Sequence, residues 1–372
     1  MKPVARIANI LIYRREEEIS LDLSFLSWLQ FQPYPKILWP SRAAAGLVTA
    51  FTEIPQIESL TDSSLRLYGW QHFEGDNQTK VGNEWRLFPK KYYYLPEYEL
   101  FNRNNKTIFA INSLTSDFRL PTPNFSRFQL PSAEIWADWL LSRPVEKVVL
   151  ARRVSISSAL LIAEQLQPTF FIQMAPESAF FGKPPEYLYK RHGRHLESEA
   201  VAGTQLLGEP HTAKDHRELD YIESALRAAL TPLSTSELLF SSLTTRIAGT
   251  LHHLCRTCSC ELREEVTDTD LLKALHPTPA VGGWPREEAL AYLSNCEPFK
   301  RGLYAAPVGW ISSESAEWLV AIRSALLDGD TLHLYSGAGI VNESQADQEW
   351  QELNRKLKWA TTNLTPAGSS IS

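Results

Sequence analysis

Short runs rich in aromatic and β-branched residues recur through the first third of the chain, and they constrain its fold more than any other feature. The runs cover residues 5–13, 65–73, 85–95 and 106–112, with turn residues such as Gly75 and Asn104 between them. Such side chains favour the pleated, half-buried surface of a sheet. We therefore expect residues 1 to about 119 to form a large antiparallel or mixed sheet.

A proline-rich connector follows these runs. Pro121, Pro123 and Pro131 punctuate residues 121–131, and residues 133–142 resume with the spacing of an amphipathic helix. This is the one internal boundary that the sequence indicates. We predict a strand-rich part at residues 1–130, a second region at 131–365 and a disordered tail at 366–372.

The composition is that of a globular protein. Of the 372 residues, 44% are hydrophobic and 22% are charged, so the chain can bury a large core. The net charge of -6 gives no electrostatic reason to bind nucleic acid or an anionic membrane. No apolar run approaches the ~20 residues of a membrane span, and Arg14 and Arg15 follow the first apolar patch, the wrong order for a signal peptide. We expect a cytoplasmic protein.

Three cysteines gather at Cys255, Cys258 and Cys260, just after His252 and His253. A zinc knuckle is one interpretation, and the chain would then serve as a non-catalytic zinc-binding interaction module. No second ligand pair follows at a zinc-ribbon distance, however. Residues 253–262 alternate as a strand does, which favours thiols buried as small hydrophobic groups in a reducing compartment.

Two glycines and a group of charged residues mark the C-terminal part. Gly337 and Gly339 flank one alanine, and Glu349, Glu352 and Lys356 follow. Glycines let a backbone approach an anionic ligand, and an acidic turn downstream can hold a hard cation over that ligand. Backbone relief in a turn and a solvated helix face are the alternatives for the same residues.

Two further residues have the chemistry of a base and an acid. Lys147 enters an apolar, β-branched run, where partial desolvation would lower its pKa toward that of a usable base. A lysine that only flanks a strand is the alternative. Glu199 stands beside small residues and Gly203, which suits an acid facing a ligand pocket.

Six motifs follow one another in the second part of the chain. They are Lys-Val-Val-Leu-Ala-Arg at 147–152, Glu-Ala-Val-Ala-Gly-Thr at 199–204, Leu-His-Pro-Thr-Pro-Ala-Val-Gly-Gly at 275–283, Arg-Gly-Leu-Tyr-Ala-Ala-Pro-Val-Gly-Trp at 301–310, Val-Ala-Ile-Arg-Ser-Ala at 320–325 and Gly-Ala-Gly-Ile-Val at 337–341. The motifs and their order resemble those of the chorismate-utilising enzymes, and most closely those of the isochorismate synthases. The resemblance implies an α+β fold of the anthranilate synthase component I type, with two sheets packed face to face and helices outside. The N-terminal strands would complete that sandwich, and helices are expected at residues 214–230, 286–294 and 348–360.

The resemblance also implies roles for individual residues. Lys147 matches the lysine that activates water, where ammonia-using relatives carry glutamine, and Glu199 matches the general acid. Glu218 and Glu352 match two Mg²⁺ ligands, and Glu349 is placed to hold a metal-bound water. The residues that match substrate contacts are Gly203, Thr204, His276, Tyr304, Arg323, Gly337, Gly339 and Lys356.

The expected activity is the Mg²⁺-dependent, reversible isomerisation of chorismate to isochorismate, feeding menaquinone or siderophore biosynthesis, by a monomer without a glutaminase partner. A salicylate synthase or another chorismate-utilising enzyme is the alternative. Lys147 argues against the ammonia route, and Ala280 and Val281, where many lyase-competent relatives carry threonine, argue against elimination of pyruvate. Departures from the family pattern, which concern local loop geometry, are Pro184, Leu219 and Ala306.

Overall fold

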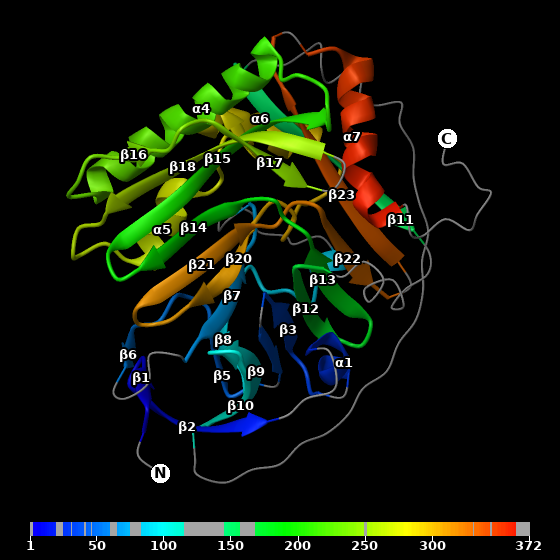
Figure 1. Ribbon diagram of the computed structural model, residues 1–372. Helices are drawn as coiled ribbons and strands as arrows, with labels where there is room; N and C mark the ends of the chain where they lie inside the picture. Colours follow the sequence, from blue (N-terminus) through cyan, green and yellow to red (C-terminus); the bar gives the residue numbers. More distant parts are fainter. Residues whose placement is uncertain are drawn as a thin grey trace.

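Two large antiparallel sheets pack face to face in the computed structural model of this protein, with helices on their outer sides (Figure 1). The structure describes residues 3–19, 25–30, 32–40, 42–45, 47–59, 65–74, 83–114, 145–156, 168–248, 251–329, 331–342 and 344–361. The connector predicted at 121–131, the helix predicted at 133–142 and the tail predicted at 366–372 lie outside these residues. The expected α+β sandwich is confirmed.

The first sheet contains 13 strands among the described residues. In spatial order they are β19 (Gly283–Trp284), β11 (Lys147–Ile156), β23 (Thr331–Ile340), β22 (Ser324–Asp328), β13 (Ser178–Gly182), β12 (Phe170–Ala175), β3 (Lys36–Trp39), β4 (Arg42–Ala45), β9 (Tyr98–Arg103), β10 (Lys106–Ser113), β2 (Ile10–Ile19), β1 (Ala5–Ile7) and β6 (Ile57–Ser59). Phe171 of β12 lies opposite Leu38 of β3. The N-terminal strands therefore continue the sheet that β11 and β23 begin.

The second sheet contains 10 strands in the same described ranges. In spatial order they are β16 (Leu239–Phe240), β18 (Leu251–Glu261), β15 (His195–Leu206), β14 (Tyr187–His192), β21 (Ser315–Val320), β20 (Pro307–Ile311), β7 (Leu67–Gln71), β8 (Lys91–Leu95) and β5 (Thr49–Phe51), and β17 (Thr244–Ala248) also pairs with β18. Trp70 of β7 lies opposite Val308 of β20. An N-terminal strand thus joins a C-terminal one here as well.

The helices flank the sheets (Figure 1). α4 (Ala213–Leu230) packs on β15 and β18, α7 (Ala346–Thr361) packs on β23, and α1 (Phe25–Gln30), α5 (Asp268–Leu275) and α6 (Arg286–Cys296) contact β4, α4 and β19 respectively. Thr212 and Asp215 form a capping box that fixes where α4 begins. The three predicted helices are confirmed as α4, α6 and α7. None of the helices in the described ranges has both the length and the hydrophobicity for a membrane crossing.

Two of the four predicted strand runs differ from the structure. Residues 5–13 are not one strand, because Ala8 (φ 44°) and Asn9 (φ 71°) make a hairpin turn between β1 and β2. In residues 85–95 the strand begins only at Lys91. Trp85 and Phe88, which precede it, are buried in the core but do not belong to a strand. The runs 65–73 and 106–112 are confirmed as β7 and β10.

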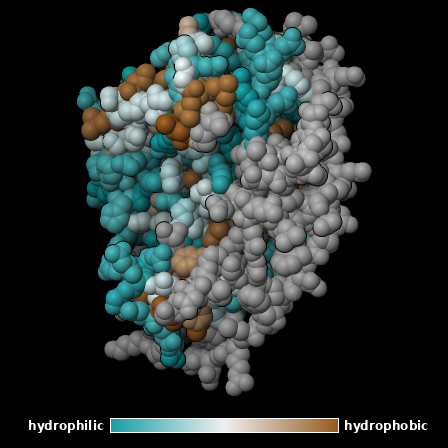
Figure 2. All heavy atoms as spheres, turned by 45° about the vertical axis from the view of Figure 1, so that its right-hand side comes forward, coloured by the Kyte–Doolittle hydropathy of each residue, from teal (hydrophilic) through white to brown (hydrophobic). Residues whose placement is uncertain are grey.

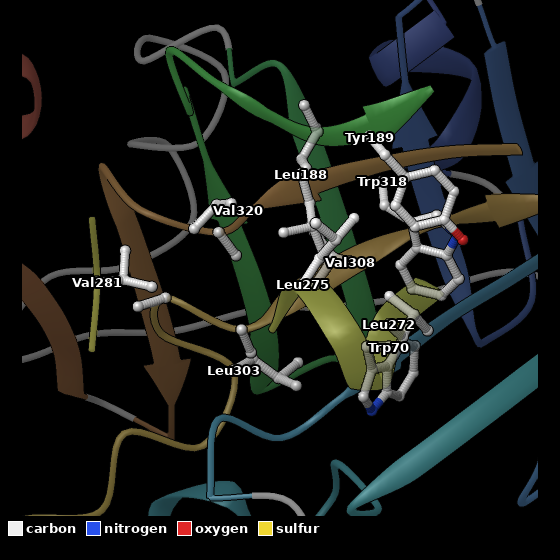
Figure 3. Packing of buried hydrophobic residues seen from close by; sticks show 14 of the residues in the cluster. Trp70, Leu188, Tyr189, Leu272, Leu275, Val281, Leu303, Val308, Trp318 and Val320 are labelled. Atoms are coloured by element: carbon white, nitrogen blue, oxygen red, sulfur yellow. The ribbon is translucent and has the colours of Figure 1, made fainter. Parts of the chain in front are cut away.

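The main hydrophobic cluster among the described residues joins side chains of both sheets with side chains of α4, α5 and α6. Figure 3 shows part of this cluster, with Trp70, Val308 and Trp318 of the second sheet and Leu272 of α5 among its members. Burying each such side chain stabilises the fold by roughly 1.5–3 kcal/mol, and these residues come from both the N-terminal and C-terminal parts. On the face shown in Figure 2, by contrast, hydrophilic residues prevail among the coloured atoms and apolar ones form small patches.

β18 confirms the strand that the cysteine pattern predicted. Cys255, Cys258 and Cys260 are all buried in it, and the last two belong to the main hydrophobic cluster. Burial raises the pKa of Cys258 to about 12 and that of Cys260 to about 11. Both groups therefore stay neutral thiols near pH 7 and pack as small hydrophobic side chains, as predicted.

Candidate active site

A cavity opens where the start of β11 and the ends of β15 and β23 meet α4 and α7. Most of the predicted site residues line it, although they come from widely separated parts of the chain. The predicted residues at its wall are Lys147, Gly203, Thr204, Glu218, Tyr304, Arg323, Gly337, Gly339, Glu352 and Lys356. The fold thus brings the motifs of the C-terminal region together around one space.

Lys147, the first residue of β11, is a buried amine at this wall. Its side chain is 1% exposed, and Nζ lies 3.5 Å from Glu218 Oε2. Burial lowers the pKa of Lys147, although the Glu218 carboxylate opposes the shift. A lowered pKa increases the share of neutral amine, which is the form that can accept a proton.

Lys214 connects the cavity wall to a carboxylate behind it. Its Nζ lies 3.5 Å from Glu218 Oε1 and donates a hydrogen bond of 2.5 Å to Glu349 Oε1. Glu349 is buried in the first turn of α7 and does not line the cavity. Glu218 and Glu349 therefore share the charge of one lysine.

Two cationic side chains face the cavity from opposite elements. Lys356 of α7 pairs with Glu352 at 2.6 Å and donates to the carbonyl of Gly337 at 2.9 Å. Arg323 lies just before β22 with φ 51°, and its Nη2 is 3.4 Å from Nε2 of His253. Burial and Arg323 lower the pKa of His253 to about 3, so this ring is neutral and supports the guanidinium without repelling it.

His253 has a position in the wall that the sequence did not predict. Its Nδ1 lies 3.3 Å from Oγ1 of Thr204, so His253 bridges Thr204 and Arg323 across the cavity wall. The pattern in the sequence associated this histidine with the nearby cysteines. Only the pairing of β18 with β15, with His253 opposite Thr204, places it in the site.

Gly337 and Gly339 lie inside strand β23, opposite Ala151 and Val149 of β11, so the turn that the alternative interpretation assumed is not present here. The acidic residues downstream belong to helix α7. A Cβ at position 337 would lie 2.8 Å from the Tyr304 hydroxyl, and one at position 339 would lie 2.7 Å from Glu218 Oε2. The two glycines therefore leave room for the Tyr304 hydroxyl and the Glu218 carboxylate in their present positions.

Glu199 and His276 do not line the cavity in this structure. Both carboxylate oxygens of Glu199 accept hydrogen bonds of 2.6 Å from Arg246. The His276 ring meets Phe73 edge-on at 5.6 Å between ring centroids, and burial lowers its pKa to about 3. The roles that the resemblance gave these two residues stay predictions.

Glu186 does line the cavity, and sequence reasoning gave it no role. Its exposed fraction is 5%, and burial followed by the charge of Glu199 raises its pKa to about 7. The only local signal was a glutamate after two prolines, directly before a strand. Glu186 directly precedes β14, and β14 pairs with β15, the strand that contains Glu199.

Glu218 and Glu352 line the cavity, and the glycine at 339 keeps space open beside Glu218. Carboxylate oxygens are the ligands that Mg²⁺ prefers, so this donor set fits the ion. Lys214 and Lys356 supply the positive charge there in this structure. Within the described ranges no three histidine, cysteine, aspartate or glutamate side chains are already gathered around one point.

Comparison with known proteins points to one family. The sequence pattern of the chorismate binding enzymes matches residues 133–365. Isochorismate synthase MenF of Haemophilus influenzae is 29% identical over 390 residues, which cover 91% of this chain and 89% of that protein. The chloroplastic isochorismate synthase of Catharanthus roseus is 28% identical over 359 residues, which cover 78% of this chain but 61% of that protein.

Solved structures agree on the fold. Menaquinone-specific isochorismate synthase MenF from Escherichia coli superposes with a TM-score of 0.77 at 24% identity, over 98% of this chain and 95% of that one. Anthranilate synthase component I from Streptococcus pneumoniae superposes with a TM-score of 0.67 at 17% identity, over 93% of this chain and 91% of that one. Because the family match at residues 133–365 also covers more than half of the chain, the protein belongs to the chorismate binding enzyme family.

Proposed function

We propose that this protein is an isochorismate synthase, which converts chorismate reversibly to isochorismate with Mg²⁺. The observation that carries the proposal is Lys147, a buried amine of lowered pKa at the wall of the cavity. By resemblance, this is the position where water-using members of the family carry a lysine and ammonia-using members a glutamine. A neutral amine here can take a proton from water, whereas a glutamine side chain cannot.

Chorismate is a dianion, and the cavity offers matching positive charge. Arg323 and Lys356 can each meet a carboxylate, and burial strengthens such charge-assisted hydrogen bonds. Glu218 and Glu352 would hold Mg²⁺, with Glu349 behind them in reach of a bound water. When bound, the ion would neutralise one substrate carboxylate and orient the ring.

By resemblance, the reaction has a base on one side of the substrate and an acid on the other. Lys147 accepts a proton from the water whose oxygen bonds to C2. The ring double bonds shift, the C4–O bond breaks, and the C4 hydroxyl leaves as water with a proton from a carboxyl group. By resemblance that acid is Glu199. One water enters and one leaves, so the reaction is an isomerisation.

A product analysis tests this function. The purified protein should convert chorismate to isochorismate when Mg²⁺ is added, reach the same mixture from isochorismate, and stop when the metal is chelated. Chromatography should detect neither salicylate nor anthranilate. Stoichiometric release of pyruvate would make the protein a lyase instead. A monomeric state, a cytoplasmic location and independence from a glutaminase are parts of the same proposal.

A further inference from the structure

Arg301 is a buried cation at the cavity wall, and sequence reasoning gave it no role although it begins one of the six motifs. Its side chain is 2% exposed, and its guanidinium donates two hydrogen bonds to Glu297, from Nε at 2.8 Å and from Nη2 at 2.5 Å. A planar guanidinium and a carboxylate joined in this way hold one fixed geometry. The Arg301–Glu297 pair is therefore suited to hold other groups in place.

The pair holds the strand that carries the proposed base. Nη2 of Arg301 also donates to the carbonyl of Val149 at 2.5 Å, and the amide of Ala151 donates to Glu297 Oε1 at 2.8 Å. Val149 and Ala151 follow Lys147 in β11. One carbonyl and one amide thus anchor the beginning of this strand to the Arg301–Glu297 pair.

The same guanidinium holds the loop at residues 276–282, between α5 and β19. Nη1 of Arg301 donates to the carbonyl of Val281 at 2.7 Å, and the amide of Val149 donates to the carbonyl of Gly282 at 3.0 Å. Val149 and Val281 both line the cavity. A single side chain therefore sets the position of two segments of the cavity wall relative to each other.

Contacts of its own backbone and ring face fix Arg301. Oε1 of Glu74 accepts a hydrogen bond of 2.7 Å from the amide of Arg301, and the guanidinium lies over the ring of Phe73, 4.3 Å from its centroid. The amide of Tyr304, a residue of the cavity wall, donates to the carbonyl of Arg301 at 2.9 Å. Arg301 thus connects three of the motifs, those at 147–152, 275–283 and 301–310.

We propose that Arg301, held by Glu297, is a positioning residue that keeps Lys147 in place by tying the start of β11 to the loop at residues 276–282. The inference rests on the proposed function, in which Lys147 is the base. The guanidinium makes four hydrogen bonds to the protein, so its donors serve this geometry and not the substrate. Displacement of a reacting group by about 1 Å can cost about 10²-fold in rate.

Arg301→Lys tests this role, because an ammonium group keeps the charge but cannot reach Glu297 and both carbonyls at once. We expect kcat to fall by about 10²-fold. KM for chorismate and the Mg²⁺ concentration needed for half-maximal rate should stay close to those of the unaltered protein, since the residues proposed to bind substrate and metal remain. A change in KM alone, with kcat retained, would contradict the inference.

Arg191 provides the matched control. Its side chain is 11% exposed, it donates two hydrogen bonds to Asp268 and two more to the carbonyls of Gly193 and Glu314, and it does not line the cavity. Arg191→Lys should lower the midpoint of thermal unfolding about as much as Arg301→Lys does, yet leave kcat unchanged. If both variants lose the same share of kcat, reduced stability explains the loss and the inference is wrong.

A double variant shows whether Arg301 acts through Lys147. If it does, Lys147→Ala combined with Arg301→Lys should be about as slow as Lys147→Ala alone, because the group that Arg301 positions is already missing. Independent effects would instead multiply, to a total loss of about 10⁴-fold, and would overturn the inference.

Failure of the inference and failure of the proposed function give different results. If the unaltered protein makes isochorismate while Arg301→Lys keeps its kcat, only the role of Arg301 is wrong. If the unaltered protein makes no isochorismate, the proposed function is wrong and the inference falls with it. Should Arg301→Lys not fold, Glu297→Gln decides the question, since it should lower kcat in the unaltered background but not in Lys147→Ala.

Discussion

Nζ of Lys147 lies 3.5 Å from Oε2 of Glu218 at the wall of the cavity. The group proposed to accept a proton and a group proposed to bind Mg²⁺ are therefore direct neighbours. Their charges influence each other, because Glu218 opposes the lowering of the Lys147 pKa. Substitution of each residue should nevertheless have distinct consequences, since one change removes a base and the other an oxygen ligand.

Lys147→Ala should fold, bind chorismate with Mg²⁺, and lose turnover by at least about 10²-fold, because the base that activates water is gone. Steady-state kinetics and equilibrium binding check this. Lys183→Ala, which changes an exposed lysine between β13 and β14, is the control and should behave as the unaltered protein does. Near-normal turnover of Lys147→Ala would mean that another group is the base.

Glu218→Ala and Glu352→Ala should instead raise the Mg²⁺ concentration needed for half-maximal rate and weaken chorismate capture. Each change removes a hard oxygen ligand, and the dianionic substrate loses its metal counter-charge. Titration with Mg²⁺ at fixed chorismate measures the shift. Asp220→Ala, exposed on the same helix as Glu218, should leave the titration unchanged. An unaltered Mg²⁺ requirement in both variants would rule out these ligands.

Gly339→Ala should reduce turnover by about 10²-fold without unfolding the protein, because its Cβ would meet Glu218 Oε2 at 2.7 Å and displace that carboxylate. Kinetics and thermal unfolding together measure the effect. Gly282→Ala is the matched control, since the nearest atoms to its Cβ lie at 3.4 Å. Equal activity of the two variants would contradict the explanation given for Gly339.

Glu99→Gln should destabilise the protein by about 3–5 kcal/mol at pH 7, since it removes the buried carboxylate that Arg14 and Arg42 share and leaves Arg14 with only Glu16 as a counter-charge. Urea unfolding measures this. Glu58→Gln removes an exposed partner of Arg6 and should cost less than about 1 kcal/mol. Equal stability of both variants would show that the buried cluster does not hold the N-terminal strands together.

The Glu99 cluster also predicts a dependence of stability on pH. Burial opposes ionisation of Glu99, but Arg14 and Arg42 outweigh it and hold its pKa below the ordinary value. The unfolded chain therefore binds this proton first, so the stabilisation is present above the unfolded pKa and is lost as pH falls through the folded pKa. Between about pH 5 and pH 2, the free energy of unfolding should therefore fall more steeply with falling pH in the unaltered protein than in Glu99→Gln.

Short, contiguous motifs are the part of the site that the sequence predicts well. The run after Lys147 predicted the strand that is β11, and the motif around Gly337 and Gly339 identified these glycines as site residues without predicting that they belong to a strand, β23. The long helices were also predictable, because α4 and α7 repeat an apolar face over several turns. The eight residues of α5 are too few for that signal, although Thr267 and Asp270 form a capping box at its N-terminus.

Contacts between distant strands are the part that the sequence does not predict. Arg246 reaches Glu199 across 47 residues because β17 and β15 both pair with β18. Neither residue type nor spacing indicates that pairing. The burial of Glu186 depends on the same arrangement, so its raised pKa had no counterpart in the local sequence pattern.

The central claim is that water adds at C2 while the C4 hydroxyl leaves, and incubation of chorismate and Mg²⁺ with the purified protein in ¹⁸O-labelled water tests it most directly. Mass spectrometry of the chromatographed product should find isochorismate with one ¹⁸O at C2, and Lys147→Ala should form it at least about 10²-fold more slowly. Isochorismate without the label would mean that the hydroxyl is transferred within the substrate, and stoichiometric pyruvate or unchanged chorismate would contradict the assigned reaction altogether.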